Sequence, residues 1–541
     1  MTAPPNTPIP PRRRALMILL ALATLVVVMD VTILNVALEE TQRELGASNA
    51  GLQWALDSYT ITFATLIFTT GVCIDRFGQR RTLIVGLVIF GVASVLAGYS
   101  GSIGELIAWR AVMGVGAAVI PTASLAIIMR EFPPPERPRA IAMWASTGGI
   151  SLVAGPLIGG LLLVEFWWGS VFLINAPLVL AGIVLAFVFV PESQPGRQAR
   201  FEPVAVLLSI AAIGLLVYGV VVGGQDNEWA SVEVWGSIVA GLALTAVLVS
   251  VERRRRTPSL DMGLFKSARF SAGTAVVSLA FFAFMGAIYV LTFYFQSVLG
   301  YSPLEAGLLT VPMGVGSLAT AILAPRLTAA FTVRGVIAAG ALGMAAAFVC
   351  FSLFGAETPL IALLAVLLLY GLGWGCIQAP ATGALMSAVP LPKAGAGQAI
   401  SQTLRQVGTA LGIAVTGSVL GAVYRSSFGS ERDRFPADLQ DEAAGSIGGT
   451  HRALAEVHEQ AGSGGVSDRL LALDRDAAAV VEHAADSYLS AMGVAMLLTA
   501  AIAVLAAAVA WRWLPKVLPP PGPPPAPPAQ DGAPEKTRSM S

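Results

Sequence analysis

Three ionisable residues lie inside long apolar stretches of the sequence, where a charge is costly. Asp30 is the one charged residue of 15–38, and Asp57 and Arg110 lie in two later apolar stretches. A charged side chain at the centre of a bilayer costs about 3 kcal/mol on insertion scales, so it usually faces a partner or a water-filled cavity and marks an ion or substrate pathway. The alternative for Asp30 is a carboxylate at a helix end, near the lipid headgroups.

Helix geometry places these three residues at similar depth. Asp30 is about eight residues, or roughly 12 Å, from the far end of its helix, and Asp57 and Arg110 are each about six residues from the same side. A guanidinium stays protonated in proteins and therefore needs a carboxylate, water or carbonyl groups, although Arg110 could also reach the membrane interface. We expect a cluster of Asp30, Arg110 and Asp57 that couples proton movement to transport. Either Asp30 or Asp57 could carry the proton.

The elements that position these residues are membrane-spanning helices. The chain has 541 residues, of which 55% are hydrophobic and 12% are charged, whereas soluble domains have about 25% charged residues. The formal net charge is zero, which gives no indication of nucleic-acid binding, and the cysteines lack metal-ligand spacing. Apolar windows long enough to cross a bilayer recur about fourteen times, at 15–38, 51–72, 82–99, 104–129, 139–163, 170–190, 203–223, 231–251, 271–298, 304–325, 333–354, 358–380, 399–424 and 486–514.

Basic residues occur in alternate loops. The basic loops contain Arg76, Arg80, Arg81, Arg130, Arg137, Arg139, Arg197, Arg200, Arg253 to Arg256, Lys266, Arg269, Arg326, Arg334 and Lys393. The other short loops contain only Arg43. Cytoplasmic loops carry the excess of Lys and Arg, so the sequence predicts that the basic loops and both termini are cytoplasmic.

An internal repeat divides the chain. The string MGVGAAVIP, which begins at Met113, is matched by LGWGCIQAP, which begins at Leu372. Gly408 and Gly412 similarly repeat the glycine-rich fifth span. These offsets predict an all-α membrane protein with two six-helix repeats and an inserted helix pair, an architecture used by transporters that bind substrate between the repeats. The expected parts are a cytoplasmic arm (1–14), the first half (15–190), a linker with two extra helices (191–269), the second half (270–514) with a long outer loop at 425–485, and a Pro-rich cytoplasmic tail (515–541).

The loop after the second span carries the most specific motif. It reads GVCIDRFGQRR, from Gly71 to Arg81, and it resembles the signature loop of the major facilitator superfamily, G-x-L-x-D-R-x-G-R-R. The resemblance implies a latch on the cytoplasmic side that helps to set the conformational switch. The alternative is a topological anchor without a role in gating. The residues expected to form the latch are Gly71, Asp75, Arg76, Gly78, Arg80 and Arg81.

Further strings resemble one branch of this superfamily. LIAWRAVMGVGAA (106–118) is similar to its second motif, and GISLVAGPLIGG is similar to the motif that marks its proton-coupled antiporters. MDVTILNVAL at the end of the first span and WWGSVFLINAP (167–177) look like the fourteen-helix drug:proton antiporters. The sequence departs from that pattern at Glu39 and in the second-half copy of the signature loop. The antiporter motif contains Gly149, Gly155, Pro156, Gly159 and Gly160.

Polar and aromatic residues on the expected cavity-lining helices are candidates for substrate contact. Aromatic faces suit flat hydrophobic cations. Tyr294 and Gln296 are the preferred candidates because FYFQSVLGYSP resembles the end of a cavity helix in the family. The alternative for each candidate is a lipid-facing or interhelical position. The full set is Asn35, Trp54, Tyr59, Tyr289, Tyr294, Gln296, Trp374, Gln378, Gln402 and Arg405.

These features predict a monomeric, multi-pass protein of the plasma membrane that exports small hydrophobic, often cationic, substrates in exchange for protons. No nucleotide-binding loop of the G-x-x-x-x-G-K-[ST] kind occurs in the sequence, so we expect a proton gradient rather than ATP or another cofactor to supply the energy. Neither an enzyme nor a nucleic-acid partner is indicated. One alternative is a dedicated exporter of a single endogenous metabolite or lipid, and another is a membrane sensor or scaffold without transport.

Overall fold

The chain folds into a bundle of long helices, which confirms the all-α class. A computed structural model of the chain describes residues 10–47, 49–192, 203–225, 231–253, 262–390, 394–462 and 468–516, and every regular element in these ranges is helical. Ten helical segments of the described part are long and apolar enough to cross a membrane. Four more helices occupy the remaining predicted spans: α2 (Asn49–Phe77), α5 (Arg137–Glu165), α8 (Pro203–Gln225) and α9 (Val232–Arg253). The number fourteen stays a prediction.

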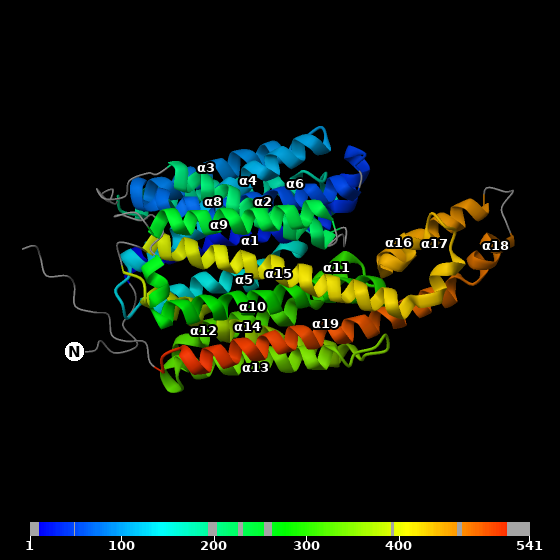
Figure 1. Cartoon of the computed structure of the whole chain (residues 1–541). Coiled ribbons are helices and arrows are strands. Elements are labelled where there is room, and N and C mark those ends of the chain that lie inside the picture. Colours follow the sequence, from blue (N-terminus) through cyan, green and yellow to red (C-terminus); the bar gives the residue numbers. More distant parts are fainter. Residues whose placement is uncertain are drawn as a thin grey trace, which may run out of the picture.

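The helices lie side by side along one direction (Figure 1). Besides α2 and α5, the first half contains α1 (Pro11–Leu45), α3 (Gln79–Gly98), α4 (Ile103–Glu131), α6 (Ser170–Leu173) and α7 (Asn175–Phe189). The second half contains α10 (Ala268–Phe293), η2 (Tyr294–Val298), α11 (Pro303–Leu309), α12 (Val311–Ala330), α13 (Val333–Phe351), α14 (Leu360–Ser387), α15 (Ala394–Phe428) and α19 (Ala477–Trp513). A short helix, η1 (Met262–Lys266), precedes α10.

The contacts between helices repeat from one half to the other. In the first half α1 packs on α5, and α4 packs on α2 and α3; in the second half α10 packs on α15, and α14 packs on α12 and α13. Glycines allow the close approaches. A Cβ on Gly116 would lie 2.6 Å from the Gly86 carbonyl oxygen, and a Cβ on Gly373 would lie 2.6 Å from the Gly340 carbonyl oxygen. By these contacts, Gly116 of the first half corresponds to Gly373 of the second half. The aligned strings pair Gly116 with Gly375 instead, which is two residues further along.

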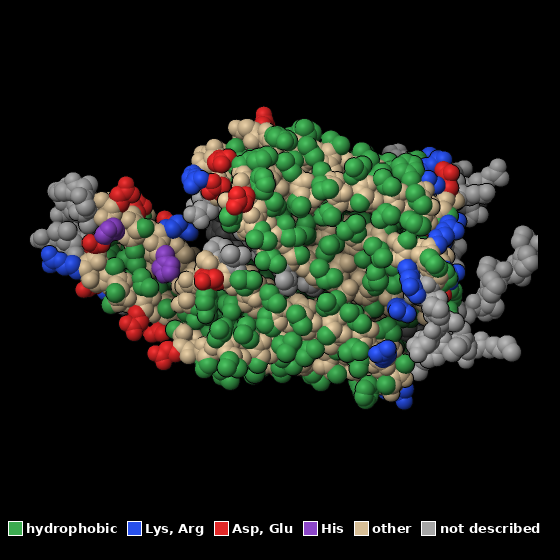
Figure 2. All heavy atoms as spheres, turned by 180° about the vertical axis from the view of Figure 1, so that it is seen from behind, with side chains coloured by type: hydrophobic (Ala, Val, Ile, Leu, Met, Phe, Trp, Pro, Cys, Tyr) green, Lys and Arg blue, Asp and Glu red, His purple; other side chains and the backbone are tan. Residues whose placement is uncertain are grey.

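The two ends of the bundle differ in charge. Lys and Arg side chains gather at one end, which we call the basic end (Figure 2). The start of α1 lies there because Arg13 Nη1 is 2.8 Å from Glu136 Oε1, in the turn before α5. The end of α19 lies there too, since the Val333 N–H donates to the Lys516 carbonyl. The described parts of both termini therefore share the end that carries the basic loops, and the cytoplasmic location of this end stays a prediction.

A helical cap projects from the opposite end of the bundle (Figure 1). The cap consists of η4 (Gly429–Arg434), α16 (Gln440–Gly445), α17 (Ile447–Gly462) and α18 (Asp468–Arg475). The segment expected as a long loop at 425–485 therefore contains short helices. The hydroxyls of Tyr424 and Thr450 are 2.6 Å apart and join the cap to α15. Burial of His451 lowers its imidazole pKa, which fits a packing role for this histidine.

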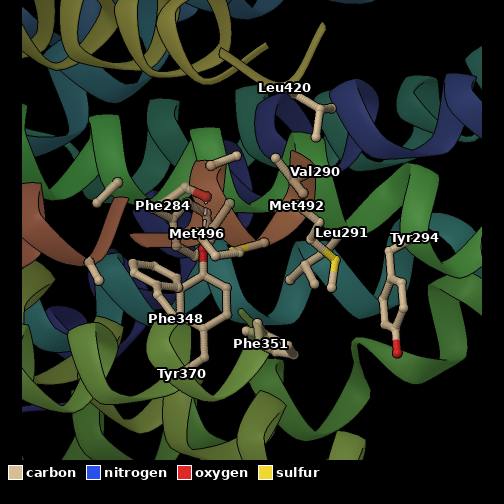
Figure 3. Packing of buried hydrophobic residues seen from close by; sticks show 14 of the residues in the cluster. Phe284, Val290, Leu291, Tyr294, Phe348, Phe351, Tyr370, Leu420, Met492 and Met496 are labelled. Carbon is tan, nitrogen blue, oxygen red and sulfur yellow. Dashed lines mark hydrogen bonds between the residues drawn. The ribbon is translucent and has the colours of Figure 1, made fainter. Parts of the chain in front are cut away.

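The apolar core of the second half continues into the cap. Phe284, Phe348 and Tyr370 form its aromatic centre, where the Tyr370 hydroxyl donates to the Phe284 carbonyl at 2.7 Å (Figure 3). Phe435 and Ala443 of the cap segment are fully buried members of the same cluster. The cap and the second half therefore share one hydrophobic core.

Candidate functional site

A buried ion pair lies inside the first half. Arg110 on α4 donates through Nη1 to Asp30 Oδ2 on α1, and the two side chains are 1% and 0% exposed. The structure thus brings together the two charges that helix geometry placed at the same depth. Taking two charges out of water is costly, so a pair of this kind needs further hydrogen bonds to be stable.

Two polar residues that the sequence analysis did not single out complete the surroundings of Asp30. Asn175 Nδ2, at the start of α7, is 3.1 Å from Asp30 Oδ1 and 3.0 Å from Ser94 Oγ on α3. The Ser94 hydroxyl donates to the Phe172 carbonyl at 2.8 Å. Asn175 and Ser94 are both fully buried. A signal was present, because a lone Asn in the apolar window 170–190 needs partners.

Arg110 has contacts besides its carboxylate. Its Nε donates to the Ala55 carbonyl on α2 at 3.1 Å. Its guanidinium carbon lies 4.3 Å from the centre of the Tyr59 ring, a cation–π distance. The Tyr59 hydroxyl donates to the Val27 carbonyl at 3.2 Å, and Val27 lies on α1, the helix that carries Asp30. Arg110 on α4 therefore contacts both α1, through Asp30, and α2, through Ala55 and Tyr59.

Asp57 lies in a different environment from this pair. It lines a cavity of about 790 Å³ between the two halves, at the end of the bundle that carries the cap. The wall includes Tyr289 of α10, Gln406 of α15, Tyr488 of α19 and residues of α16 and α17. Asp30 and Arg110 are not part of this wall. Asp57 therefore faces a cavity, whereas Asp30 is enclosed within the first half.

At the basic end the two halves pack directly on each other. Leu385 and Met386 of α14 and Ile400 of α15 belong to the same buried apolar cluster as Met129 and Trp144 of the first half. We call this packing the seam. The cavity lies near the cap, and the seam lies at the basic end.

The glycine-rich string of α5 allows close packing beside the ion pair. A Cβ on Gly155 would lie 1.9 Å from Thr32 Oγ1 and 3.2 Å from the backbone nitrogen of Ile33, only two and three residues after Asp30. Thr32 Oγ1 also lies 3.2 Å from the Ser151 carbonyl. Gly159 is buried and Gly160 is half-buried. This part of the motif sets the distance between α5 and the helix that carries Asp30.

The loop expected to act as a latch connects α2 to α3. Gly71 is buried within α2. Arg81 donates through Nε and Nη2 to Glu192 Oε1, at 3.0 and 2.7 Å, beyond α7. Arg80 lies over the Phe187 ring at 5.2 Å, and Arg76 lies over Phe77 at 5.5 Å. These contacts tie the loop to its own half, and its role as a latch stays a prediction.

Gly78 ends α2 in a backbone conformation that other residues rarely adopt, with φ 89° and ψ 151°. Replacing Gly78 with alanine should destabilise the protein by about 1–3 kcal/mol, the usual cost of such strain. The measurement is the thermal unfolding midpoint of the purified protein. Gly104→Ala is the control, since a Cβ there meets nothing within 4 Å. An unchanged midpoint for Gly78→Ala would contradict the role of this turn.

The structure distributes the predicted substrate-cavity residues over several environments. Tyr289 lines the cavity. Tyr294 does not: it is fully buried in the core of the second half, where its hydroxyl donates to the Gly355 carbonyl at 2.8 Å, because the π-helical turn η2 directs it inward. Gln296 follows on the exposed side of the same turn. Neither Tyr294 nor Gln296 lines this cavity, and a role for them in substrate contact stays a prediction.

The other candidates divide by location. Trp54 is 38% exposed and packs against Tyr218 of α8, and Trp374 stacks on Phe284 with ring centres 4.0 Å apart. Gln378 is half-buried, and Gln402 and Arg405 are buried. Four predicted site residues lie outside the part whose side chains are described: Asn35, Asp75, Gly149 and Pro156.

Two halves with matching contacts, a cavity between them and a buried charge pair are the architecture of a secondary transporter. The family model of the Major Facilitator Superfamily matches residues 20–413. The chain belongs to this superfamily; it is a transport protein rather than an enzyme, and a multi-pass protein of the plasma membrane.

Known proteins resemble the chain over most of its length. Multidrug resistance protein Stp of Mycobacterium tuberculosis is 31% identical over 500 residues, which cover 92% of this chain and 91% of that protein. Multidrug efflux pump LfrA of Mycolicibacterium smegmatis is 32% identical over 459 residues, covering 84% and 90%. The tetracenomycin C resistance and export protein of Streptomyces glaucescens is 31% identical over 491 residues, covering 91% and 89%. The proton:xylose symporter XylE has a TM-score of 0.58 at 17% identity, covering 93% and 96%, which shows the fold alone.

Proposed function

We propose that the chain exports hydrophobic, often cationic, drugs or toxicants in exchange for protons, by alternating access of a site between its two halves. The observation that carries the proposal is the buried Asp30–Arg110 pair next to the glycine-packed α1–α5 contact. A fully buried ion pair adds little to stability, whereas intramembrane ionisable groups mark ion pathways. The names of Stp and LfrA support multidrug efflux as the activity.

The two carboxylates have separate roles in this proposal. Asp57, on the cavity wall, exchanges protons and cationic substrates with the side on which the cap lies. Asp30 takes up a proton when the halves rearrange, and its neutral form releases Arg110. Because Arg110 contacts α2 through Ala55 and Tyr59, its release loosens the packing of α1, α2 and α4. The protein acts as a monomer in the lipid bilayer, with the proton gradient as its energy source and no cofactor.

Proton coupling is tested with purified protein in sealed vesicles that contain a pH-sensitive dye. Addition of a cationic substrate such as ethidium should release protons from the protein, and an imposed pH gradient should drive ethidium across the membrane. Collapse of the gradient by an ionophore should stop that flux. Ethidium flux that is unaffected by the ionophore would exclude proton exchange. Protein-free vesicles supply the control for leakage of the dye.

A dedicated exporter of one compound is the second candidate. It is favoured by one relative, whose name assigns it to resistance against and export of tetracenomycin C. A panel of cationic and neutral compounds in the same vesicles separates the two functions. Proton release by several unrelated compounds supports multidrug export, and release by one class only supports a dedicated exporter.

A further inference from the structure

A second buried cation lies where the two halves meet, and it is not paired with an acid. Arg405 on α15 is 8% exposed. Among the described residues it has no ion pair, and its Nε and Nη2 have no hydrogen-bond partner. Buried charges in proteins are ordinarily paired, because the desolvation penalty is large. Arg405 therefore needs an anion that the described residues do not supply.

The two helices whose aromatic rings contact the Arg405 guanidinium supply no counter-ion. Trp144 of α5 and Phe281 of α10 lie against its guanidinium, with ring centres 5.9 and 4.7 Å away. Helices α10, α14 and α15 contain no Asp or Glu, and the one acid of α5 is its last residue, Glu165. Glu165 is 21 residues beyond Trp144, or about 31 Å along the helix.

Other polar groups of α15 near Arg405 are also without partners. Gln398 and Ser401 are 0% and 1% exposed, and the side-chain oxygen and nitrogen of Gln398 and the hydroxyl of Ser401 lack hydrogen bonds within the described residues. The spacing of 398, 401 and 405 places these side chains on one face of a helix. Buried polar atoms are nearly always bonded, so this face has the properties of a binding surface for oxygen-rich groups.

The position of Arg405 connects it to the transport path. The next residue, Gln406, lines the cavity between the halves. Trp144 belongs to the first half and Phe281 to the second, so Arg405 lies at the seam. Phe281 in turn contacts Trp374 edge-on, with ring centres 4.7 Å apart. An aromatic surface thus adjoins the guanidinium.

We propose that Arg405 binds the carboxylate of a planar aromatic substrate, so that the transported compounds include organic acids and zwitterions as well as cations. The carboxylate accepts hydrogen bonds from the free Nε and Nη2, and the aromatic body lies against Phe281 and Trp374. The substrate reaches this position from the cavity when the seam opens. The inference rests on the proposed export function and extends its substrate class.

The test uses a xanthene dye as its free acid and as its methyl ester, which differ in the charge of one group. Equilibrium binding to the purified full-length protein is measured by fluorescence anisotropy without a pH gradient. Arg405→Gln should weaken binding of the acid at least about tenfold, the size expected for a charge-assisted hydrogen bond, and leave binding of the ester unchanged. Arg405→Lys, which keeps the charge, should retain part of the affinity for the acid. Equal loss of both dyes, or no loss of either, would overturn the proposal.

Thermal unfolding distinguishes a binding role from a structural one. Arg405→Gln should raise the unfolding midpoint without ligand, because it removes a buried charge that has no counter-ion. The acid should raise the midpoint of the wild type and not that of the variant. A lower midpoint for Arg405→Gln would identify a structural role and contradict the proposal.

Two further comparisons separate the possible failures. Binding in phosphatidylcholine nanodiscs is repeated with phosphatidylglycerol added; if the anionic lipid abolishes acid binding, Arg405 binds a lipid phosphate and the substrate assignment is wrong. Export of the methyl ester in vesicles reports on the proposed function by itself. Export of the ester together with no binding of the acid would refute the inference and leave the proposed function intact.

Discussion

Replacing Asp30 with asparagine should abolish proton-coupled efflux and leave a folded, membrane-inserted protein. The amide has nearly the shape of the carboxylate and can still accept one hydrogen bond from Arg110, but it carries no charge and cannot take up a proton. Its NH₂ group must also face a donor, either Arg110 or Asn175, because both donate to Asp30. Breaking a buried ion pair costs about 3 kcal/mol or more of stability, so the unfolding midpoint should also fall. Because the amide cannot take up a proton, we expect coupled efflux of ethidium to fall to the level of protein-free vesicles.

The measurement compares efflux, ethidium binding and expression of the variant. Asp486→Asn is the matched control, since Asp486 is an exposed carboxylate on α19; it should behave as the wild type. Retained binding with lost coupling would assign Asp30 to the proton pathway. Wild-type coupling in Asp30→Asn would remove Asp30 from that role and leave Asp57 as the proton carrier.

Replacing Gly155 with alanine should have the second-largest effect. The added Cβ would lie 1.9 Å from Thr32 Oγ1 and 2.9 Å from Thr32 Cβ, so α5 must move away from α1. Overpacking of this kind costs about 1–3 kcal/mol. The displaced contact adjoins Asp30, and we therefore expect efflux to fall by about tenfold or more in addition to a lower unfolding midpoint.

The chain supplies a matched control and a rescue for this experiment. Gly148 lies on the same helix, where a Cβ meets nothing within 4 Å, and Gly148→Ala should be close to neutral. Thr32→Ala removes the hydroxyl that the new Cβ would strike, so the double variant with Gly155→Ala should recover part of the activity. If Gly155→Ala is as active as Gly148→Ala, the α1–α5 contact does not limit transport.

The pairing of Asp30 with Arg110 could be predicted from the sequence because two physical constraints agreed. Helix rise placed both residues at one depth, and the cost of isolated charges required a partner. The same reasoning grouped Asp57 with them, but depth does not determine which way a side chain faces, and Asp57 faces the cavity. The repeated helix contacts could be anticipated for a similar reason, because matching glycine strings recur in the sequence.

Residues whose role depends on packing between helices could not be placed from the sequence. Tyr294 was favoured for the cavity, but the π-helical turn rotates it into the core. Asn175 was overlooked because a single polar residue in an apolar span does not indicate which residue it bonds to. Arg405 was included only as one cavity residue among many, since its missing counter-ion becomes visible only when α5, α10, α14 and α15 are assembled.

The cap is attached to the bundle by two long, continuous helices, and this attachment should amplify its movement. Helix α15 has 35 residues and α19 has 37, and both run without a break from the basic end to the cap. At 1.5 Å per residue each is about 50–55 Å long. A small tilt of the second half would therefore produce a large displacement at the tip of the cap. A spin label on α17 should therefore report on a tilt of the second half, and it would lie on the cap, far from Asp30 and Arg110.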